Sequence, residues 1–441
     1  MGLILCLLAA TASLALTRWK PGHGLGFVLA VGCIYGWLRA NFLDGLTHFT
    51  FDAALAGLYL GLLPRLRLAG NGSSRLATWV LILLAWPVVV ILLSPFLDAQ
   101  HVYVQVAGLR NAVLFVPMLL AGATLSRESR LELGAWAEWC IIGASCFTAG
   151  EFLLGLERFY PLNSVTRTLY ASNDITGGFF RLPASFPSAH AYGGTMVGLL
   201  PLLVARLEAL SRWRWLTLLT IGLASLGVFA CGARLPVILF GLVAGGSFLR
   251  LKRRPLAIAS LIGVMAVLGY VVSQSERLRR FETLSDTEMV EQRVVGSVNV
   301  SFVELLTEFP MGRGLGSAFG TSVPYFLADY ARPPVAIESE YGRLLLEEGL
   351  PGLLIWSWFV SLTLAKCLRG FRGLPASMAG SALVIAGSWG AGLIGAGVLA
   401  SIPGTLLLVM YMGQVWAPTR SVGAARTRSD APDSETRALY A

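Results

Sequence analysis

The sequence has little charge, few histidines and no cysteine motif for metal binding. Charged residues make up 13% of the 441 positions, about half of the roughly 25% found in soluble domains, which excludes a large soluble enzyme. The six cysteines include no C-x-x-C pair, and the four histidines show no zinc-like spacing; a disulfide scaffold is excluded and no metal site is predicted. No two aspartates stand two positions apart, so the D-x-D signature of soluble sugar-nucleotide transferases is missing.

Apolar residues, by contrast, make up 55% of the chain, and they form blocks of helix length separated by short polar breaks. A helix needs about 20 mainly apolar residues to cross a bilayer, so this supply is enough for about twelve spans. The sequence therefore predicts an all-α, polytopic integral membrane protein with about 12 to 13 transmembrane helices. The apolar blocks lie near residues 2–16, 25–38, 51–63, 77–94, 108–125, 134–155, 189–205, 215–231, 235–249, 256–273, 349–365, 377–395 and 398–416.

Lysine and arginine exceed the acidic residues by nine, and their placement predicts the topology. Alternate breaks contain 21 of the 34 Lys and Arg, as expected for cytoplasmic loops. We therefore attribute the excess of basic residues to membrane topology and not to nucleic-acid binding. We predict a polytopic domain over 1–416 with long extracytoplasmic loops at 156–188 and 274–342, followed by a disordered cytoplasmic tail at 417–441. Because Arg18 follows the first apolar block, we expect that block to be a retained span and not a signal peptide.

Arg234 is the most informative candidate residue, because it interrupts nearly continuous apolar sequence in residues 228–249. An ionisable side chain at membrane depth is costly and generally faces a polar cavity or a partner. The alternative is a tight outer hairpin in which Arg234 simply reaches the membrane surface.

Arg181 and His190 stand at the start of a span rich in small residues. A guanidinium can donate two parallel N–H hydrogen bonds to the oxygens of a phosphate, and histidine titrates near neutral pH. Arg181 can equally be an interfacial anchor, and His190 can be a residue that starts a helix. Arg110 stands at the outer start of its predicted span.

Glu338, Glu340, Arg343 and Glu347 stand near the end of the second long loop. On a helix the last three fall at i, i+3 and i+7 and form one polar stripe. A carboxylate at the rim of a membrane cavity can act as a general base; Glu340 or Glu338 is the first candidate, and His190 the second. The alternative is a salt-bridged helix at the membrane interface.

The order and spacing of these segments resemble the O-antigen ligase and O-antigen polymerase superfamily of bacterial envelopes. Members have many spans, a long external loop late in the chain and functional arginines near the outer face, which implies a GT-C-like architecture. Residues 231–235 resemble the S-R-G segment of the family, although Ala233 and Leu235 replace its Ser and Gly. Ligases usually carry His-Asn where this chain has residues 338–341, and the missing histidine favours polymerisation. The other segments that carry the resemblance are 180–203 (an Arg, then F-x-x-P and a Gly-containing span), 302–319 (E-x-P-x-x-G-x-G-x-x-F) and 347–353 (E-x-G).

The resemblance implies an enzyme of the bacterial inner membrane that uses a polyprenyl-pyrophosphate-linked oligosaccharide as glycan donor. The acceptor would be a sugar hydroxyl of a second lipid-linked repeat unit at the outer leaflet. Arg181, Arg234 and Arg110 would bind the pyrophosphate and stabilise its developing charge, without a metal or another cofactor. Further partners would be the bilayer lipids, a chain-length regulator and a flippase.

Two alternative functions are considered. An O-antigen ligase would perform the same chemistry with lipid A core as the acceptor. A transporter or flippase of lipid-linked sugars belongs to a different class, in which charged residues near mid-span and repeated halves are common. Here the charges within spans are few, chiefly Glu138 and Glu151, and the candidate residues cluster toward the outer face, which favours an enzyme.

Overall fold

The computed structural model consists of helices and loops, and the part of the chain that it describes contains no β-strand. Among these described residues, seven helical segments are long and apolar enough to cross a membrane; the predicted class, an all-α, polytopic membrane protein, is confirmed, whereas the predicted number of 12 to 13 spans stays a prediction. The described residues are 1–69, 74–96, 99–166, 181–209, 214–251, 301–318, 324–332, 335, 337, 339–395 and 397–417. The seven candidate spans are Gly2–Trp19, Pro21–Asn41, Gly45–Leu66, Arg75–Phe96, Val102–Thr124, Arg127–Leu154 and Glu340–Gly373.

The helices follow the apolar blocks of the sequence. Of the thirteen predicted blocks, the one at 256–273 lies outside the described residues, and each of the others overlaps a helix. The block at 108–125 is divided between two helices, and the block at 398–416 becomes helical only at Gly404. The first three blocks extend into full helices of 18, 21 and 20 residues. All but the first residue of the predicted tail at 417–441 also lies outside the described residues. The helices are α1 (Gly2–Trp19), α2 (Pro21–Asn41), η1 (Gly45–Phe49), α3 (Thr50–Ala69), α4 (Ser74–Leu93), η2 (Ser94–Phe96), α5 (Val102–Val113), α6 (Met118–Thr124), α7 (Arg127–Leu154), η3 (Leu156–Arg158), α9 (Ala189–Ala209), α10 (Arg214–Ala230), α11 (Arg234–Phe248), α14 (Ser301–Glu308), η6 (Tyr325–Tyr330), α15 (Glu340–Gly370), η7 (Phe371–Gly373), α16 (Ala376–Ala391) and α17 (Gly404–Trp416).

Small residues allow these helices to pack closely. α9 packs against α7, α10, α11, α16 and α17, and α1 packs against α2 and α3. Where α6 meets α17, Gly122 faces the carbonyl of Met410 and Gly413 faces the carbonyl of Leu119, and neither position leaves room for a Cβ. Such glycine contacts let helix backbones approach closely, which favours association of helices within a membrane.

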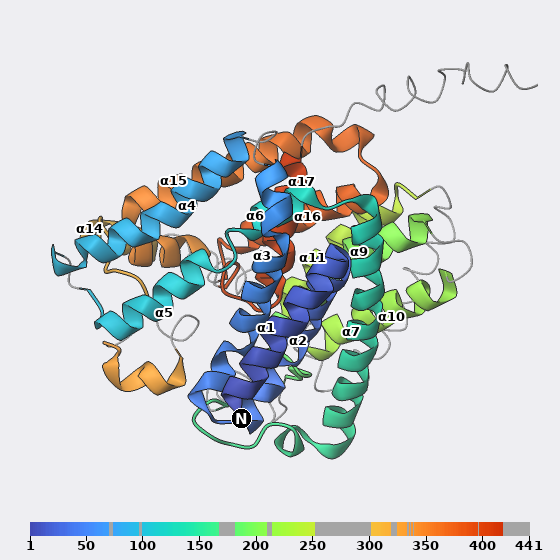
Figure 1. Cartoon of the computed structure of the whole chain (residues 1–441), viewed down its shortest axis with the longest axis horizontal. Helices are drawn as coiled ribbons and strands as arrows, with labels where there is room; N and C mark the ends of the chain where they lie inside the picture. The colour runs from blue at the N-terminus through green and yellow to red at the C-terminus, as the bar shows by residue number, and fades with distance from the viewer. Residues whose placement is uncertain are drawn as a thin grey trace, which may run out of the picture.

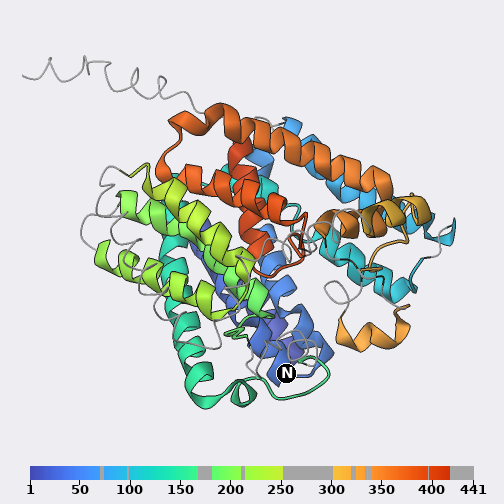
Figure 2. The same ribbon diagram turned by 180° about the vertical axis from the view of Figure 1, so that it is seen from behind.

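A second group of helices lies beside this bundle. Figure 1 shows α4 and α15 side by side and oblique to α1, α2 and α3, and Figure 2 shows the same pair from behind. α5 packs on α4, and α14 packs on α15. α14 and the turn after it therefore lie against the beginning of α15, where the predicted polar stripe is located.

α15 is interrupted at Gly349, whose φ of 73° is a conformation that favours glycine. In a regular helix the N–H of Leu350 would donate to the carbonyl of Leu346. Here Leu350 donates to the carbonyl of Pro310 (2.9 Å), and the carbonyl of Leu346 accepts from the N–H of Arg313 (2.6 Å). The glycine-rich turn after α14 thus satisfies both backbone groups that the kink leaves open.

Hydrogen bonds between helix ends define two opposite ends of the bundle. At the first, which we call the site end, Leu182 before α9 bonds to the last residue of α10, and Glu340 bonds to the loop after α16. At the second, which we call the basic end, Arg250 after α11 donates to carbonyls just before α16, and Glu208 of α9 accepts from the N–H of Ala376. The basic end contains the breaks that the sequence predicts to be cytoplasmic.

Candidate functional site

Residues 181–188, immediately before α9, form a buried strap held by several elements. Ser185 binds α2 through both its hydroxyl and its carbonyl. The N–H of Ala184 donates to the carboxylate of Glu151 in α7 (3.0 Å), and the hydroxyl of Tyr160 donates to the Ala184 carbonyl (2.5 Å). Because buried hydrogen bonds of this kind are costly to leave unmade, the strap has one well-defined path along the site end.

The strap places Arg181 against His190. Nη1 of Arg181 lies 3.1 Å from Nε2 of His190. A guanidinium has only donors, so Nε2 accepts this hydrogen bond and the proton of the neutral imidazole lies on Nδ1. Arg181 is 9% exposed, whereas His190 is exposed; the structure therefore puts a buried cation directly behind an accessible imidazole.

Arg234 is the first residue of α11 and follows a sharp turn at Gly232, whose φ is 62°. Ala233, at the N-cap, has no side-chain acceptor for the first N–H groups of the helix. The partial positive charge of the helix start and the guanidinium both favour an anion here. The hairpin that the sequence left as an alternative is present, and it brings Arg234 to the site end.

The α10–α11 turn also brings Arg234 next to the strap that carries Arg181. The N–H of Leu182 donates to the carbonyl of Ala230 (3.4 Å). Cys231, the next residue of this turn, is buried and lies close enough to Arg181 to experience its charge. The segments that carry the two arginines, which are far apart in the sequence, are therefore adjacent in the fold.

Glu340 joins the same region through the α16–α17 loop. Gly395 in this loop lies beside the side chain of Leu235, and its carbonyl accepts from the N–H of Glu340 (3.1 Å). The carboxylate of Glu340 accepts in turn from the N–H groups of Gly397 (2.6 Å) and Val398 (2.9 Å). Glu340 thus fixes the loop that packs against the start of α11.

Arg343 completes the surroundings of Glu340. Its guanidinium forms ion pairs with Glu340 (2.5 Å) and with Glu347 (2.6 Å), and all three side chains are buried. The three side chains thus form the predicted polar stripe on one helix, with the salt bridges of the alternative interpretation. These contacts occupy both oxygens of Glu340 and favour a positioning role over that of an open base. Glu338 lies outside the described residues.

Arg110 belongs to the last turn of α5 and not to the start of its span, because the helix begins earlier than the apolar block. It forms a bidentate ion pair with Asp52 of α3, with Nε and Nη2 at 2.6 and 2.7 Å from the carboxylate oxygens. This pairing offsets its charge, so Arg110 is a weaker phosphate ligand than its position in the sequence suggests.

Sequence reasoning missed three side chains that shape the site. Tyr160 holds the strap from a loop, and no motif marks it. Asp52 pairs with Arg110, and its place at the start of a predicted span was an available signal. Glu151 was noted only as a charge within a span, but its carboxylate binds the strap backbone.

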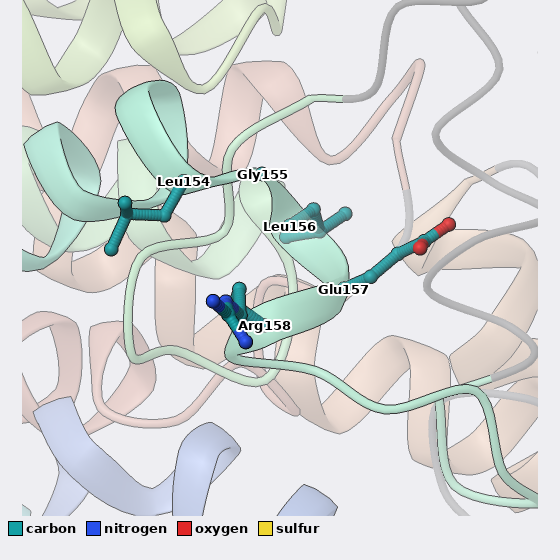
Figure 3. A pocket seen from close by; sticks show the side chains of 5 residues that line it. All are labelled: Leu154, Gly155, Leu156, Glu157 and Arg158. Carbon is teal, nitrogen blue, oxygen red and sulfur yellow. The ribbon is translucent and has the colours of Figure 1, made fainter.

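A separate surface hollow lies at the end of α7 and is lined by residues 154–158 (Figure 3). The side chains of Glu157 and Arg158 point to different sides of the hollow in this view. Five consecutive residues form it, and none of them is a predicted site residue, so we assign no function to it. Within the described ranges, no group of three or more His, Cys, Asp or Glu side chains could hold a metal ion.

A scan against protein-family models finds no match, and a search of curated proteins finds none either.

Replacing Gly36 by alanine is expected to displace the strap. Gly36 in α2 packs directly on the backbone of Phe186, with no room for a Cβ; the added methyl group should cost about 1–3 kcal/mol, more than alanine gains in helix propensity. Gly222→Ala in α10 is the matched control, because its Cβ meets nothing within 4 Å. Thermal unfolding in detergent should show a lower midpoint for Gly36→Ala only; equal midpoints would contradict the close packing.

Proposed function

We propose that the chain is a polysaccharide polymerase of the bacterial inner membrane. It transfers glycan from a polyprenyl-pyrophosphate donor to a sugar hydroxyl of a second lipid-linked repeat unit. The observation that carries this proposal is the contact of Arg181 with His190, together with the hydrogen bond that holds Leu182 against the end of α10, just before the turn that leads to Arg234. The family resemblance of the sequence around the same three residues supports it.

In this proposal the two arginines act on the leaving group. Cleavage of the bond between sugar and phosphate moves negative charge onto the pyrophosphate. Fixed cations that need no rearrangement stabilise this charge in the transition state. Arg181 is held by the buried strap, and Arg234 adds the N-terminal dipole of α11 to its own charge.

We assign the acceptor proton to His190, because its imidazole is exposed beside the arginine pair. When Arg181 turns toward a phosphate oxygen, Nε2 of His190 is released to accept a proton from the sugar hydroxyl. Glu340 then acts as a positioning residue that holds the α16–α17 loop against α11. Glu340 as the base, which we considered first from the sequence, would have to give up contacts with two backbone N–H groups.

The distribution of lysine and arginine between the loops indicates how the helical bundle is oriented in the membrane. We propose that the basic end faces the cytoplasm together with the C-terminal tail, and that the site end faces the outer leaflet. The full architecture would comprise 12 or 13 spans with a long extracytoplasmic loop, in a GT-C-like arrangement.

The charges within the spans support an enzyme over a transporter. Glu138 accepts hydrogen bonds from Arg206 (2.8 Å) and Thr217 (2.6 Å), and Glu151 binds the strap. These carboxylates are committed to structural contacts, whereas a transport path needs polar groups that change partners.

A product-size assay tests the proposal. Purified protein in lipid is incubated with a polyprenyl-pyrophosphate oligosaccharide, with lipid A core present in the same tube. We expect a ladder of lengths that remain on polyprenyl pyrophosphate. A single shift onto the core lipid would instead indicate a ligase, and no new species with donors of several sugar compositions would contradict both enzyme proposals.

A further inference from the structure

Arg39, in the last turn of α2, is a cation at the site end that the function above does not use. Among the described residues, no acidic side chain forms an ion pair with it, and its guanidinium lies 5.3 Å from the ring centre of Tyr35. Its Nε is buried and has no hydrogen-bond acceptor. A buried donor without an acceptor costs about 1–3 kcal/mol, and more when the group is charged. The position therefore favours a ligand that supplies an acceptor.

The surroundings of Arg39 carry a net positive charge. Asp52 is already bound by both nitrogens of Arg110, and the charge of Arg39 acts on the same carboxylate from a greater distance. Among the described residues, the other nearby carboxylate, Asp44, lies 3.8 Å from the N-terminal ammonium group, so the charge of Arg39 is not matched by an acidic side chain of its own. An anion that binds next to Arg39 would balance the cluster, and this balance is what makes partly buried charges tolerable.

The short helix η6, in the second long loop, lies next to this cluster. The hydroxyl of Tyr325 in η6 donates to the carbonyl of Leu43 (2.7 Å), and the ring of Phe326 packs edge-on against His48. Burial raises the pKa of Tyr325, and the charge of Arg39 opposes that rise, so Arg39 is close to this segment. Two aromatic side chains of η6 therefore lie next to the cluster.

Apolar side chains lie exposed beside the cluster. Leu43 and Leu46, between α2 and η1, are 50% and 47% exposed. The planar guanidinium of Arg39 suits an anionic head group, and the exposed leucines next to it suit an alkyl chain. Together, at the end of membrane-spanning helices, they favour an amphiphile with an anionic head. A free anion would make no use of the leucines.

We propose that Arg39, with the Arg110–Asp52 pair beside it, binds the phosphate of a lipid at the site end. The phosphate belongs to a polyprenyl-type lipid or to a membrane phospholipid; both present the same acceptor oxygens next to an alkyl chain. This site is separate from the Arg181–Arg234 pair, and the inference needs no transfer activity.

Binding to the purified full chain in a nonionic detergent tests the proposal. The probes are farnesyl diphosphate, a short-chain phosphatidylglycerol and inorganic phosphate, with farnesol as the uncharged comparison. We expect Arg39→Gln to weaken binding of one of the two lipid phosphates about tenfold or more, the effect of losing a charge-assisted hydrogen bond. The matched control is Arg158→Gln, which removes an exposed arginine after α7 and should leave binding unchanged.

Asp52→Asn separates a local electrostatic effect from a folding defect. It removes the only carboxylate that pairs with Arg110 among the described residues, so lipid-phosphate binding should become tighter, whereas misfolding would weaken it. The lipid that responds to Arg39→Gln identifies the source of the phosphate. Unchanged binding of both lipids by Arg39→Gln, an equal loss in Arg158→Gln, or equal binding of inorganic phosphate would overturn the proposal.

Discussion

Arg234→Ala should lower polymer formation by about 100-fold or more while the protein still inserts and accumulates, and Arg181→Ala should do the same. Removal of one preorganised group that stabilises a developing negative charge typically costs this much in rate. Both side chains lie at the site end on segments held by backbone hydrogen bonds, so the fold should tolerate their loss. The measurement is the yield of ladder products per amount of folded protein.

The control for the arginine variants is Arg372→Ala. Arg372 is an exposed arginine at the basic end, and its replacement should leave the product ladder unchanged. Normal activity in both Arg181→Ala and Arg234→Ala would remove the proposed role of the pair in pyrophosphate binding. Loss of activity in all three variants would indicate a general effect of charge removal.

Glu340→Gln should lower both the thermal stability and the activity of the protein. The carboxylate accepts from Arg343 and from two backbone N–H groups of the α16–α17 loop. An amide offers one oxygen in place of two and turns an NH2 group toward donors, which should cost about 2–4 kcal/mol of folding free energy. Far-UV circular dichroism on heating measures the shift of the unfolding midpoint.

Glu304→Gln is the control, since Glu304 is an exposed carboxylate on α14. Comparing Glu340→Gln with this control also distinguishes the two possible roles of Glu340, positioning residue and general base. A positioning residue predicts a lower unfolding midpoint together with reduced activity, and His190→Ala should then lose activity without losing stability. An unchanged midpoint combined with complete loss of transfer would show that Glu340 is the base.

The helices were predictable because each depends on local composition. A block of apolar residues bounded by polar breaks has few alternatives in a bilayer, and this rule located α4 and α9 well. The kink at Gly349 was not predictable in the same way. It depends on Pro310 and Arg313, which satisfy its backbone groups from a distant segment, and such pairings are not visible in a single sequence.

The candidate residues of the site could be selected from the sequence by residue type, but most of their contacts could not. A charge within apolar sequence singled out Arg234, and helical spacing predicted the pairing of Arg343 with Glu340. The neutralisation of Arg110 by Asp52 required the fold. So did the hydrogen bonds of Tyr160 to the strap.

The central claim is that the site end faces the outer leaflet, where a lipid-linked donor is displayed. Its most direct test is cysteine labelling in a background in which the six native cysteines are replaced by alanine. A membrane-impermeant maleimide applied to intact bacterial spheroplasts should label Arg158→Cys and Arg234→Cys, and it should label Arg372→Cys only after permeabilisation. The reverse pattern would place Arg181 and Arg234 on the cytoplasmic side and contradict transfer at the outer leaflet.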